Sequence, residues 1–553
     1  MENLVVFSRL FGYIRYFHPS DQTAVAEWEK LALAGVQAAE RAGGAEELAL
    51  ILEDFFCPVA PTVRVFPAGR RPALPAELAP LPGVAKFETT FWEHLGVGLQ
   101  SSPPYRSQRI SNPPSPAPGE PFVVDLGGGV SALVPLVLYK DVQGTLPHVS
   151  PDFRPSAPAK PEGFVPSGDD RATRLADVVL AWNVFQHFYP YFDVVQADWP
   201  SELRRALSAA ATDRDSQAFL GTLRRLVAAL HDGHGGVYHA SEDRSYRLPL
   251  LWDWVEDQLA VTRIAPQGAA GLRPGDVVVA IDGRPAREVL AAREELISGA
   301  TPRWRRWRAL HEIAAGKGGE PVRLVGRHPG GEAFAVTLPR SLPTFGAGSL
   351  EETRPAKIAA VRPGIFYVDL SRISDQDFEG ALDRLAAARG IVFDLRGHPS
   401  NLSPIVIAHL IDRPVTSPRW HIPVVTRPDR QDWEWETSAG PIHPQSPRLQ
   451  ARAAFLADGR TISYAETYLG MVEHYRLAEI VGGPTAGTNG DINSFVLPGG
   501  YQVIWTGLKV LKHDGSQHHG VGIQPTVPVS RTLEGVAEGR DELLEKAIEV
   551  VSP

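Results

Sequence analysis

The stretch Asp458-Gly-Arg-Thr-Ile-Ser463-Tyr-Ala-Glu466 decides how the rest of the chain is interpreted. An apolar run ending at Leu456 precedes it, the Asp-Gly pair breaks that run, and apolar residues at helical spacing follow Ser463. The pattern predicts a strand, a sharp turn and a helix. A serine hydroxyl at such a turn is exposed, and backbone N–H groups at the positive helix end can stabilise an oxyanion. The alternative is an N-cap serine with a structural role only.

Three upstream segments carry further glycine-flanked polar residues. Residues 390–397 predict a buried strand that ends in a polar glycine turn, Asp394-Leu-Arg-Gly397. Residues 226–236 predict the end of a helix followed by Asp232-Gly-His234. Between them, residues 270–283 have the loop, strand and turn pattern of a PDZ domain. A glycine-rich run, residues 481–490, follows the predicted Ser463 helix.

In this order, the segments resemble the C-terminal-processing-protease and tricorn family of serine peptidases, over roughly the last two-thirds of the chain. The resemblance implies an α/β core of the crotonase-like (ClpP/crotonase) type with a PDZ-like domain. It also implies cleavage of peptide or protein substrates through an acyl-enzyme intermediate. Ser463 matches the family's nucleophile because it stands three residues before Glu466, as in the family's Ser-x-x-Glu. Gly397 and Tyr464 match the residues whose backbone N–H groups form the family's oxyanion hole.

The general base distinguishes two branches of this family. Processing proteases use a lysine from the glycine-rich loop, and the corresponding position here is Thr488, which cannot act as that base. The tricorn-like branch uses a histidine, which His234 matches. Its unperturbed pKa of about 6.5 suits a base near neutral pH. The alternative is a histidine that only contacts the last carbonyls of its helix.

The residue that orients His234 is left open by the sequence. Tricorn-like enzymes use a serine before the histidine and a distant glutamate, whereas this chain has Gly233 before His234. Asp232, His519 and Asp514 are the candidates. A metal site built from His513, Asp514, His518 and His519 is disfavoured, because neighbouring strand residues point to opposite faces. No metal or other cofactor is therefore expected.

An internal repeat precedes these motifs. Residues 10–19 parallel residues 181–190 at an offset of 171, which also relates Trp28 to Trp199. Only the second copy ends in a histidine, so the first is expected to be structural, with its aromatic residues buried. The predicted organisation is a helical repeat (1–66), a Pro/Gly-rich β segment and linker (67–168), a second helical repeat carrying His234 (169–244), a PDZ-like domain (245–343) and an α/β serine-hydrolase core (344–553).

Several longer elements are also predicted from periodicity. They are a strand pair at 122–126 and 130–139, a helix at 375–388 and a hairpin containing 502–511.

Composition narrows the functional classes. The net charge of −9 and the absence of a basic run argue against nucleic acid as a partner. No stretch is apolar enough to span a membrane, and no signal peptide is recognisable. The expected location is therefore the cytoplasm, or outside it if an N-terminal signal was trimmed. The alternatives to a peptidase are a hydrolase or acyltransferase for a non-peptide ester and a binding protein for a small hydrophobic ligand. The sequence predicts no particular oligomeric state.

Overall fold

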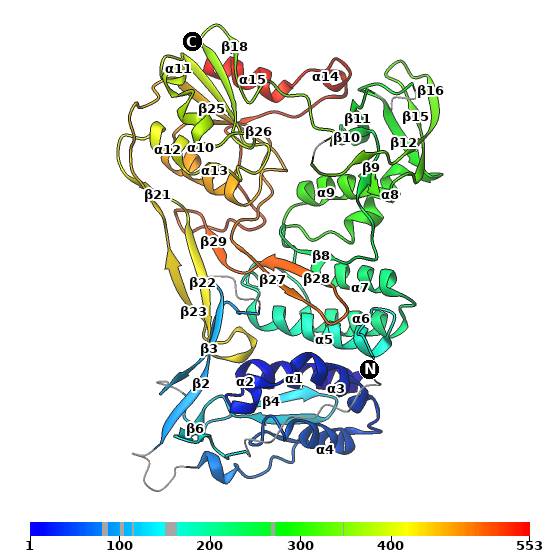
Figure 1. Cartoon of the computed structure of the whole chain (residues 1–553), viewed down its shortest axis with the longest axis vertical. Helices are drawn as coiled ribbons and strands as arrows, with labels where there is room; N and C mark the ends of the chain where they lie inside the picture. The colour runs from blue at the N-terminus through cyan, green and yellow to red at the C-terminus, as the bar shows by residue number, and fades with distance from the viewer. Residues whose placement is uncertain are drawn as a thin grey trace.

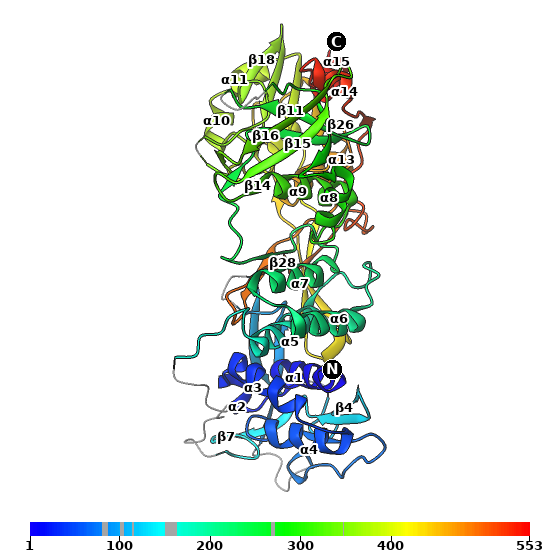
Figure 2. The ribbon, with the colours of Figure 1, turned by 90° about the vertical axis from the view of Figure 1, so that its right-hand side faces the viewer.

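The computed structural model describes residues 1–79, 87–99, 104–112, 116–149, 163–266, 271–346 and 348–552. Part of the predicted linker, residues 150–162, and the start of the PDZ-like pattern at Ala270 lie outside these ranges. The chain is elongated, with the N-terminal helices toward one end and a mixed α/β segment at the other (Figure 1). Figure 2 shows the same order along the long axis from the side.

Two helical segments pack against each other in the N-terminal half. The first contains α1 (Glu2–Phe17), α2 (Asp21–Val25), α3 (Trp28–Glu40) and α4 (Ala45–Phe56), and the second contains α5 (Arg171–Phe188), α6 (Trp199–Thr212) and α7 (Ser216–Ala228). Helices α1 and α3 both contact α5, and one hydrophobic core includes residues of both segments. The predicted burial of Phe11, Tyr13, Tyr16 and Phe17 is confirmed, since none is more than 4% exposed.

Strands from distant parts of the chain share a seven-stranded sheet in the order β23-β22-β2-β6-β7, with β3 on β2 and β29 on β22. Its strands are β2 (Glu88–Leu95), β3 (Arg106–Ser111), β6 (Leu138–Asp141), β7 (Gly144–Thr145), β22 (Arg419–Val425), β23 (Glu434–Ser438) and β29 (Lys509–Leu511). Strands β2, β22 and β23 run along one side of the molecule between the N-terminal helices and the α/β segment (Figure 1). The sheet therefore ties the segment 67–168 to the C-terminal segment.

Two three-stranded sheets follow the two helical segments. The first sheet consists of β1 (Arg64–Pro67), β5 (Val130–Val134) and β4 (Phe122–Gly127), and the second of β8 (Gly236–Tyr238), β28 (Gln502–Thr506) and β27 (Ile492–Val496). Strand β8 pairs with β28 antiparallel. This pairing brings the end of the second helical segment against the C-terminal segment.

Residues 245–343 form a sheet with two helices. The sheet order is β10 (Leu250–Val255), β11 (Gln258–Ile264), β12 (Val277–Ile281), β15 (Pro321–Arg327) and β16 (Ala333–Pro339), with β13 (Arg284–Pro285) on β12. The helices are α8 (Ala286–Glu294) and α9 (Pro302–Ala314). A small sheet joins β9 (Tyr246–Arg247) to β14 (Ala315–Gly316) and β17 (Leu342–Pro343).

The C-terminal segment is built on a six-stranded sheet. Its order is β18 (Ile358–Arg362), β19 (Ile365–Asp369), β20 (Gly390–Asp394), β25 (Arg452–Ala457), β26 (Glu479–Gly482) and β30 (Val527–Pro528), parallel from β19 onward. Its helices are α10 (Asp375–Glu379), α11 (Leu382–Ala386), α12 (Ile405–Leu410), α13 (Tyr464–Tyr475), α14 (Leu533–Ala537) and α15 (Glu542–Val551). Because β20 and β25 are parallel neighbours, the loops after them lie at one sheet edge.

Short elements complete the described chain. They are the 3-10 turns Ala76–Leu78 and Pro428–Arg430 and the strand pair β21 (Val415–Thr416) and β24 (Pro441–Ile442).

Three predicted elements differ from the structure. The strand predicted at 130–139 is divided into β5 and β6, with Pro135 in the break, because proline lacks the N–H that a ladder needs. The helix predicted at 375–388 is interrupted between α10 and α11 near Gly380. The predicted hairpin strand 502–511 is split at Gly507 into β28 and β29, which pair with β27 and β22.

Candidate active site

Ser463 occupies a strained turn between β25 and α13. Its backbone dihedrals are φ 61° and ψ −125°. A positive φ is uncommon for a residue that carries a Cβ and costs of order 1–3 kcal/mol. The Ser463 side chain makes no capping hydrogen bond, whereas Ser374 caps α10 through its hydroxyl. The structure therefore gives no support to the N-cap interpretation of Ser463 and instead matches a nucleophile turn.

Glu466 holds the glycine-rich loop against the start of α13. This fully buried carboxylate accepts hydrogen bonds from the N–H groups of Gly487 at 2.9 Å and Thr488 at 2.8 Å. It also accepts from the Thr485 hydroxyl, and His518 Nε2 lies 3.4 Å away. Because its carboxylate is surrounded by donors, Glu466 fixes the loop 485–488 beside Ser463. This is the physical role of the glutamate of Ser-x-x-Glu in this chain.

Thr488 links the Ser463 turn to the segment that carries His234. Its carbonyl accepts the Ser463 N–H at 2.8 Å, and its Oγ1 accepts the Gly233 N–H at 3.0 Å. A Cβ at Gly233 would lie 2.5 Å from Thr488 Oγ1 and 3.1 Å from Ile462 Cδ1. Position 233 therefore has no room for a side chain beside Thr488. The threonine at the lysine position thus joins two segments that are far apart in sequence.

His234 is held by a hydrogen-bonded chain through Thr506 to Asp232. His234 Nδ1 lies 2.9 Å from Thr506 Oγ1, and this hydroxyl donates to Asp232 at 2.6 Å. A hydroxyl has one proton, so the Thr506 oxygen that donates to Asp232 must accept from the ring. The geometry therefore favours the tautomer with a proton on Nδ1, which leaves the Nε2 lone pair free.

Asp232 is a buried anchor for this arrangement. Its carboxylate also accepts the His234 N–H at 3.0 Å and the Thr506 N–H at 2.6 Å, and its own side chain is fully buried. Of the three candidates for orienting His234, the structure brings Asp232 to it, and the contact runs through Thr506. Sequence reasoning missed Thr506, because a threonine in a strand is an ordinary β-sheet residue.

Burial lowers the pKa of His234 below its ordinary value, although Asp232, Glu466 and Asp491 act in the opposite direction. The charge of Arg308 adds to the lowering. The imidazole is therefore neutral at neutral pH, the form in which it can accept a proton. Among the described residues, no hydrogen bond joins the ring to Ser463.

Gly397 and Tyr464 present free N–H groups beside this site. Within the described part of the chain, neither N–H donates to another protein group. The rings of His398 and Tyr464 are 6.3 Å apart, and the charge of His234 contributes to the lowered pKa of His398. The Gly397 loop, the Ser463 turn and His234 are therefore neighbours, as the sequence predicts.

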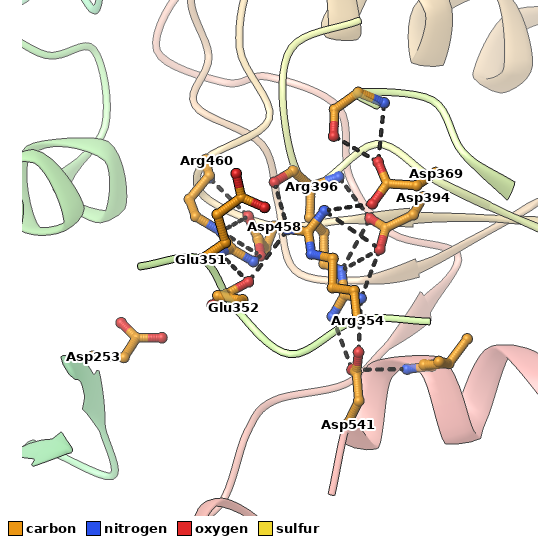
Figure 3. Close-up of polar contacts among 12 residues, drawn as sticks. Asp253, Glu351, Glu352, Arg354, Asp369, Asp394, Arg396, Asp458, Arg460 and Asp541 are labelled. Carbon is orange, nitrogen blue, oxygen red and sulfur yellow. Dashed lines mark hydrogen bonds and ion pairs between the residues drawn. The ribbon is translucent and has the colours of Figure 1, made fainter. Parts of the chain in front are cut away.

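A network of ion pairs fixes the Gly397 loop (Figure 3). Arg396, which is only 3% exposed, donates to Asp394 at 2.7 Å and to Asp541 at 2.8 Å. Arg354 adds a bond to Asp369 at 3.2 Å. Because Gly397 directly follows Arg396, this network sets the position from which its N–H projects.

Other predicted residues lie outside this arrangement. His519 stacks on Tyr191 at 4.1 Å and pairs through Nε2 with the His231 carbonyl, so it is not the residue that orients His234. Asp514 is exposed and accepts from Ser516 in its own turn, and among the described residues it makes no hydrogen bond to His234. The two lysines of the C-terminal hairpin region, Lys509 and Lys512, are paired with Asp193 and Glu473.

In the ranges that the structure describes, no group of three or more His, Cys, Asp or Glu side chains could hold a metal ion. None of the described helices is both long and apolar enough to cross a bilayer.

Comparisons with known proteins concern the segment that contains Ser463 and the fold. Residues 364–529 match the family model described as Peptidase family S41. The structure is similar to mature CPAF, with 16% identity over 68% of this chain and 96% of that chain and a TM-score of 0.55. A CPAF point mutant gives a TM-score of 0.57 with 16% identity over 69% and 97%, and CPAF complexed with lactacystin gives 0.55 over the same shares at 16% identity. At this identity the likeness concerns the fold. No curated protein matches the sequence.

A mixed α/β segment with a strained serine turn, together with this family match, defines a serine-type peptidase. Within this class, residues 364–529 are similar to peptidase family S41.

Proposed function

We propose that the protein hydrolyses peptide bonds through an acyl-enzyme intermediate, with Ser463 as nucleophile and His234 as general base. The Ser463 oxygen attacks the carbonyl carbon of the substrate, and its proton moves to His234 Nε2. The backbone N–H groups of Gly397 and Tyr464 stabilise the oxyanion. His234 then gives the proton to the leaving amine, and water hydrolyses the acyl-enzyme by the reverse proton transfers.

The observation that carries this proposal is the chain from His234 Nδ1 through the Thr506 hydroxyl to Asp232. It supports a ring whose Nε2 is unprotonated and whose developing positive charge is compensated by a buried carboxylate. Asp232 and Thr506 act here as positioning residues. The absence of a base from the lysine position, where Thr488 stands, supports the same assignment.

The same proposal includes the organisation of the chain. Residues 344–553 are the crotonase-like catalytic core, 245–343 a PDZ-like domain and 67–168 a β segment and linker. Residues 1–66 and 169–244 are two copies of one helical module. Helices α3 and α6 begin at Trp28 and Trp199, and α4 and α7 at Ala45 and Ser216, each pair 171 residues apart, which supports the duplication.

A fluorophosphonate probe tests the nucleophile. The wild-type protein should be labelled on Ser463 and should cleave peptides, and Ser463→Ala should remain folded but lose labelling and at least about 10³-fold in turnover. Ser374→Ala is the matched control, because Ser374 is a capping serine in the same segment. It should be labelled and active like the wild type. Peptide cleavage that survives in folded Ser463→Ala would refute the proposal.

A further inference from the structure

A cavity of about 450 Å³ lies between the residues 245–343 and the C-terminal segment. Gly397, His398 and Ile462, the residue before Ser463, line one side of it. Trp252, Trp304 and Trp307 line another side. The cavity is therefore continuous with the proposed active site and has an aromatic wall.

Five arginines line this cavity, and four of them are paired with carboxylates. The pairs are Arg354 with Asp369 at 3.2 Å, Arg372 with Asp369 at 2.7 Å, Arg396 with Asp394 at 2.7 Å and Arg460 with Asp458 at 2.6 Å. Figure 3 shows Arg354, Arg396 and Arg460 with their carboxylate partners. Their positive charge is thus already compensated.

Arg247, the fifth arginine of the cavity, has no carboxylate partner among the described residues. Its side chain comes from β9 and is only 5% exposed, and its buried Nε has no acceptor. Within the described residues, its guanidinium makes no ion pair or hydrogen bond. Burial lowers the pKa of Arg247, and no carboxylate contributes to its pKa.

His311, a titratable group that feels the charge of Arg247, is not an anion either. His311 also lines the cavity, and burial together with the charge of Arg247 lowers its pKa to about 4. His311 is therefore neutral at neutral pH. A buried and unpaired guanidinium is costly, and proteins keep buried charges mainly where a partner compensates them. The described part of the chain supplies no such partner for Arg247, which leaves its guanidinium available to a ligand.

We propose that Arg247 binds a carboxylate of the peptide substrate in this cavity, next to the scissile bond. The proposal rests on the peptidase function above and adds a specificity for acidic substrates to it. The planar guanidinium fits a carboxylate with two parallel hydrogen bonds. The carboxylate is that of an acidic side chain of the substrate.

Peptide binding to the Ser463→Ala protein, measured by calorimetry, tests this subsite without catalysis. One set of capped hexapeptides carries Glu or Gln at each position in turn, and a second set is neutral with a free or an amidated C-terminus. At least one acidic peptide should bind about tenfold or more tightly than its neutral analogue. The preference should occur in the Glu/Gln set, and a preference confined to the set with free and amidated C-termini would overturn the side-chain subsite.

The preference should disappear when Arg247→Met is added and persist when Arg284→Met is added. Arg284 is an exposed arginine of the same segment, which makes it the matched control. Arg247→Met should also melt at the same or a higher temperature than the wild type, because it removes an unpaired buried charge. A purely structural arginine would instead lose stability on this change.

Equal binding of acidic and neutral peptides, or an acidic preference that survives Arg247→Met, would overturn the subsite. Labelling of wild-type Ser463 by the fluorophosphonate, carried out in parallel, keeps this result separate from the proposed function. If labelling succeeds and the carboxylate preference is absent, only the subsite fails. If labelling fails, the peptidase mechanism fails whatever the peptides do.

Discussion

In the two helical segments, residues 1–66 and 169–244, helices α3 and α4 start 171 residues before α6 and α7, but the turns that follow α4 and α7 differ. The first segment continues from α4 through Val63 into β1, and the second from α7 through His234 into β8. Val63 is a core residue with 3% exposure, whereas His234 is partly exposed. The turn after the first segment thus places a buried apolar side chain, Val63, where the turn after the second segment places a titratable one, His234.

The strand that follows each segment finds a different partner. Strand β1 pairs with β5, from the segment that follows it in sequence. Strand β8 pairs with β28, which ends at Thr506. Because β28 belongs to the C-terminal segment, only the second helical segment is joined to the strand that supplies the partner of its histidine.

A histidine in the first segment shows the contrast in another way. His18 is fully buried, with Nδ1 3.1 Å from Ser20 Oγ and Nε2 2.9 Å from Thr62 Oγ1. Burial lowers its pKa to about 3. Both ring nitrogens are occupied by hydroxyls, so His18 holds a structure together, whereas His234 uses Nδ1 alone for this purpose. His18 and His234 therefore differ in that Nε2 of His234 makes no hydrogen bond with a described residue.

The largest effect that this contrast predicts is for His234→Ala. Removing the base should lower kcat by at least about 10³-fold while the protein remains folded. His239→Ala, directly after strand β8, should reduce kcat by less than about threefold, because the His239 ring is engaged by Ser241, the Gly499 carbonyl and a stacked Tyr501 ring. Steady-state kinetics with a cleavable peptide and circular dichroism measure both. An active His234→Ala would show that the histidine after the second helical segment is not the general base, so the two segments would not differ in function as proposed.

An intermediate effect is expected for Thr506→Val. The valine keeps the shape but breaks the link between His234 Nδ1 and Asp232, so the tautomer is no longer fixed. We expect kcat to fall by about 10²-fold with little change in KM, and Thr506→Ser, which keeps the hydroxyl, to retain most of the activity. Equal losses in the valine and serine variants would show that the hydroxyl is not what matters.

The smallest effect on turnover is expected for His18→Ala. It leaves the hydroxyls of Ser20 and Thr62 without their ring partner and opens a cavity, so the free energy of unfolding should fall by about 2–4 kcal/mol. Since the first helical segment lies outside the site, kcat should stay within about twofold of the wild type. Urea unfolding and kinetics of the same preparation test this. A collapse of kcat without a change in stability would reverse the roles of the two segments.

The sequence predicted those parts of the site that are marked by local signals. Glycine turns and helix starts pointed to Ser463, His234 and Gly397 as candidates, and the repeated aromatic pattern predicted helices in both segments. The partner of His234 has no local signal, because Thr506 reaches it only through the pairing of β28 with β8. The seven-stranded sheet was missed for the same reason, since β2 and β22 are joined by contacts between residues such as His94 and Val425. Long-range strand pairing leaves little trace in a single sequence.

The central claim is that His234 activates Ser463, and the pH dependence of acylation tests it most directly. The rate of fluorophosphonate labelling of Ser463 should rise with an apparent pKa below 6.5 and be constant from neutral pH upward, because burial lowers the pKa of His234. In His234→Ala the labelling should be lost across this range. A labelling rate that climbs through alkaline pH and persists in folded His234→Ala would contradict the account and indicate a lysine base.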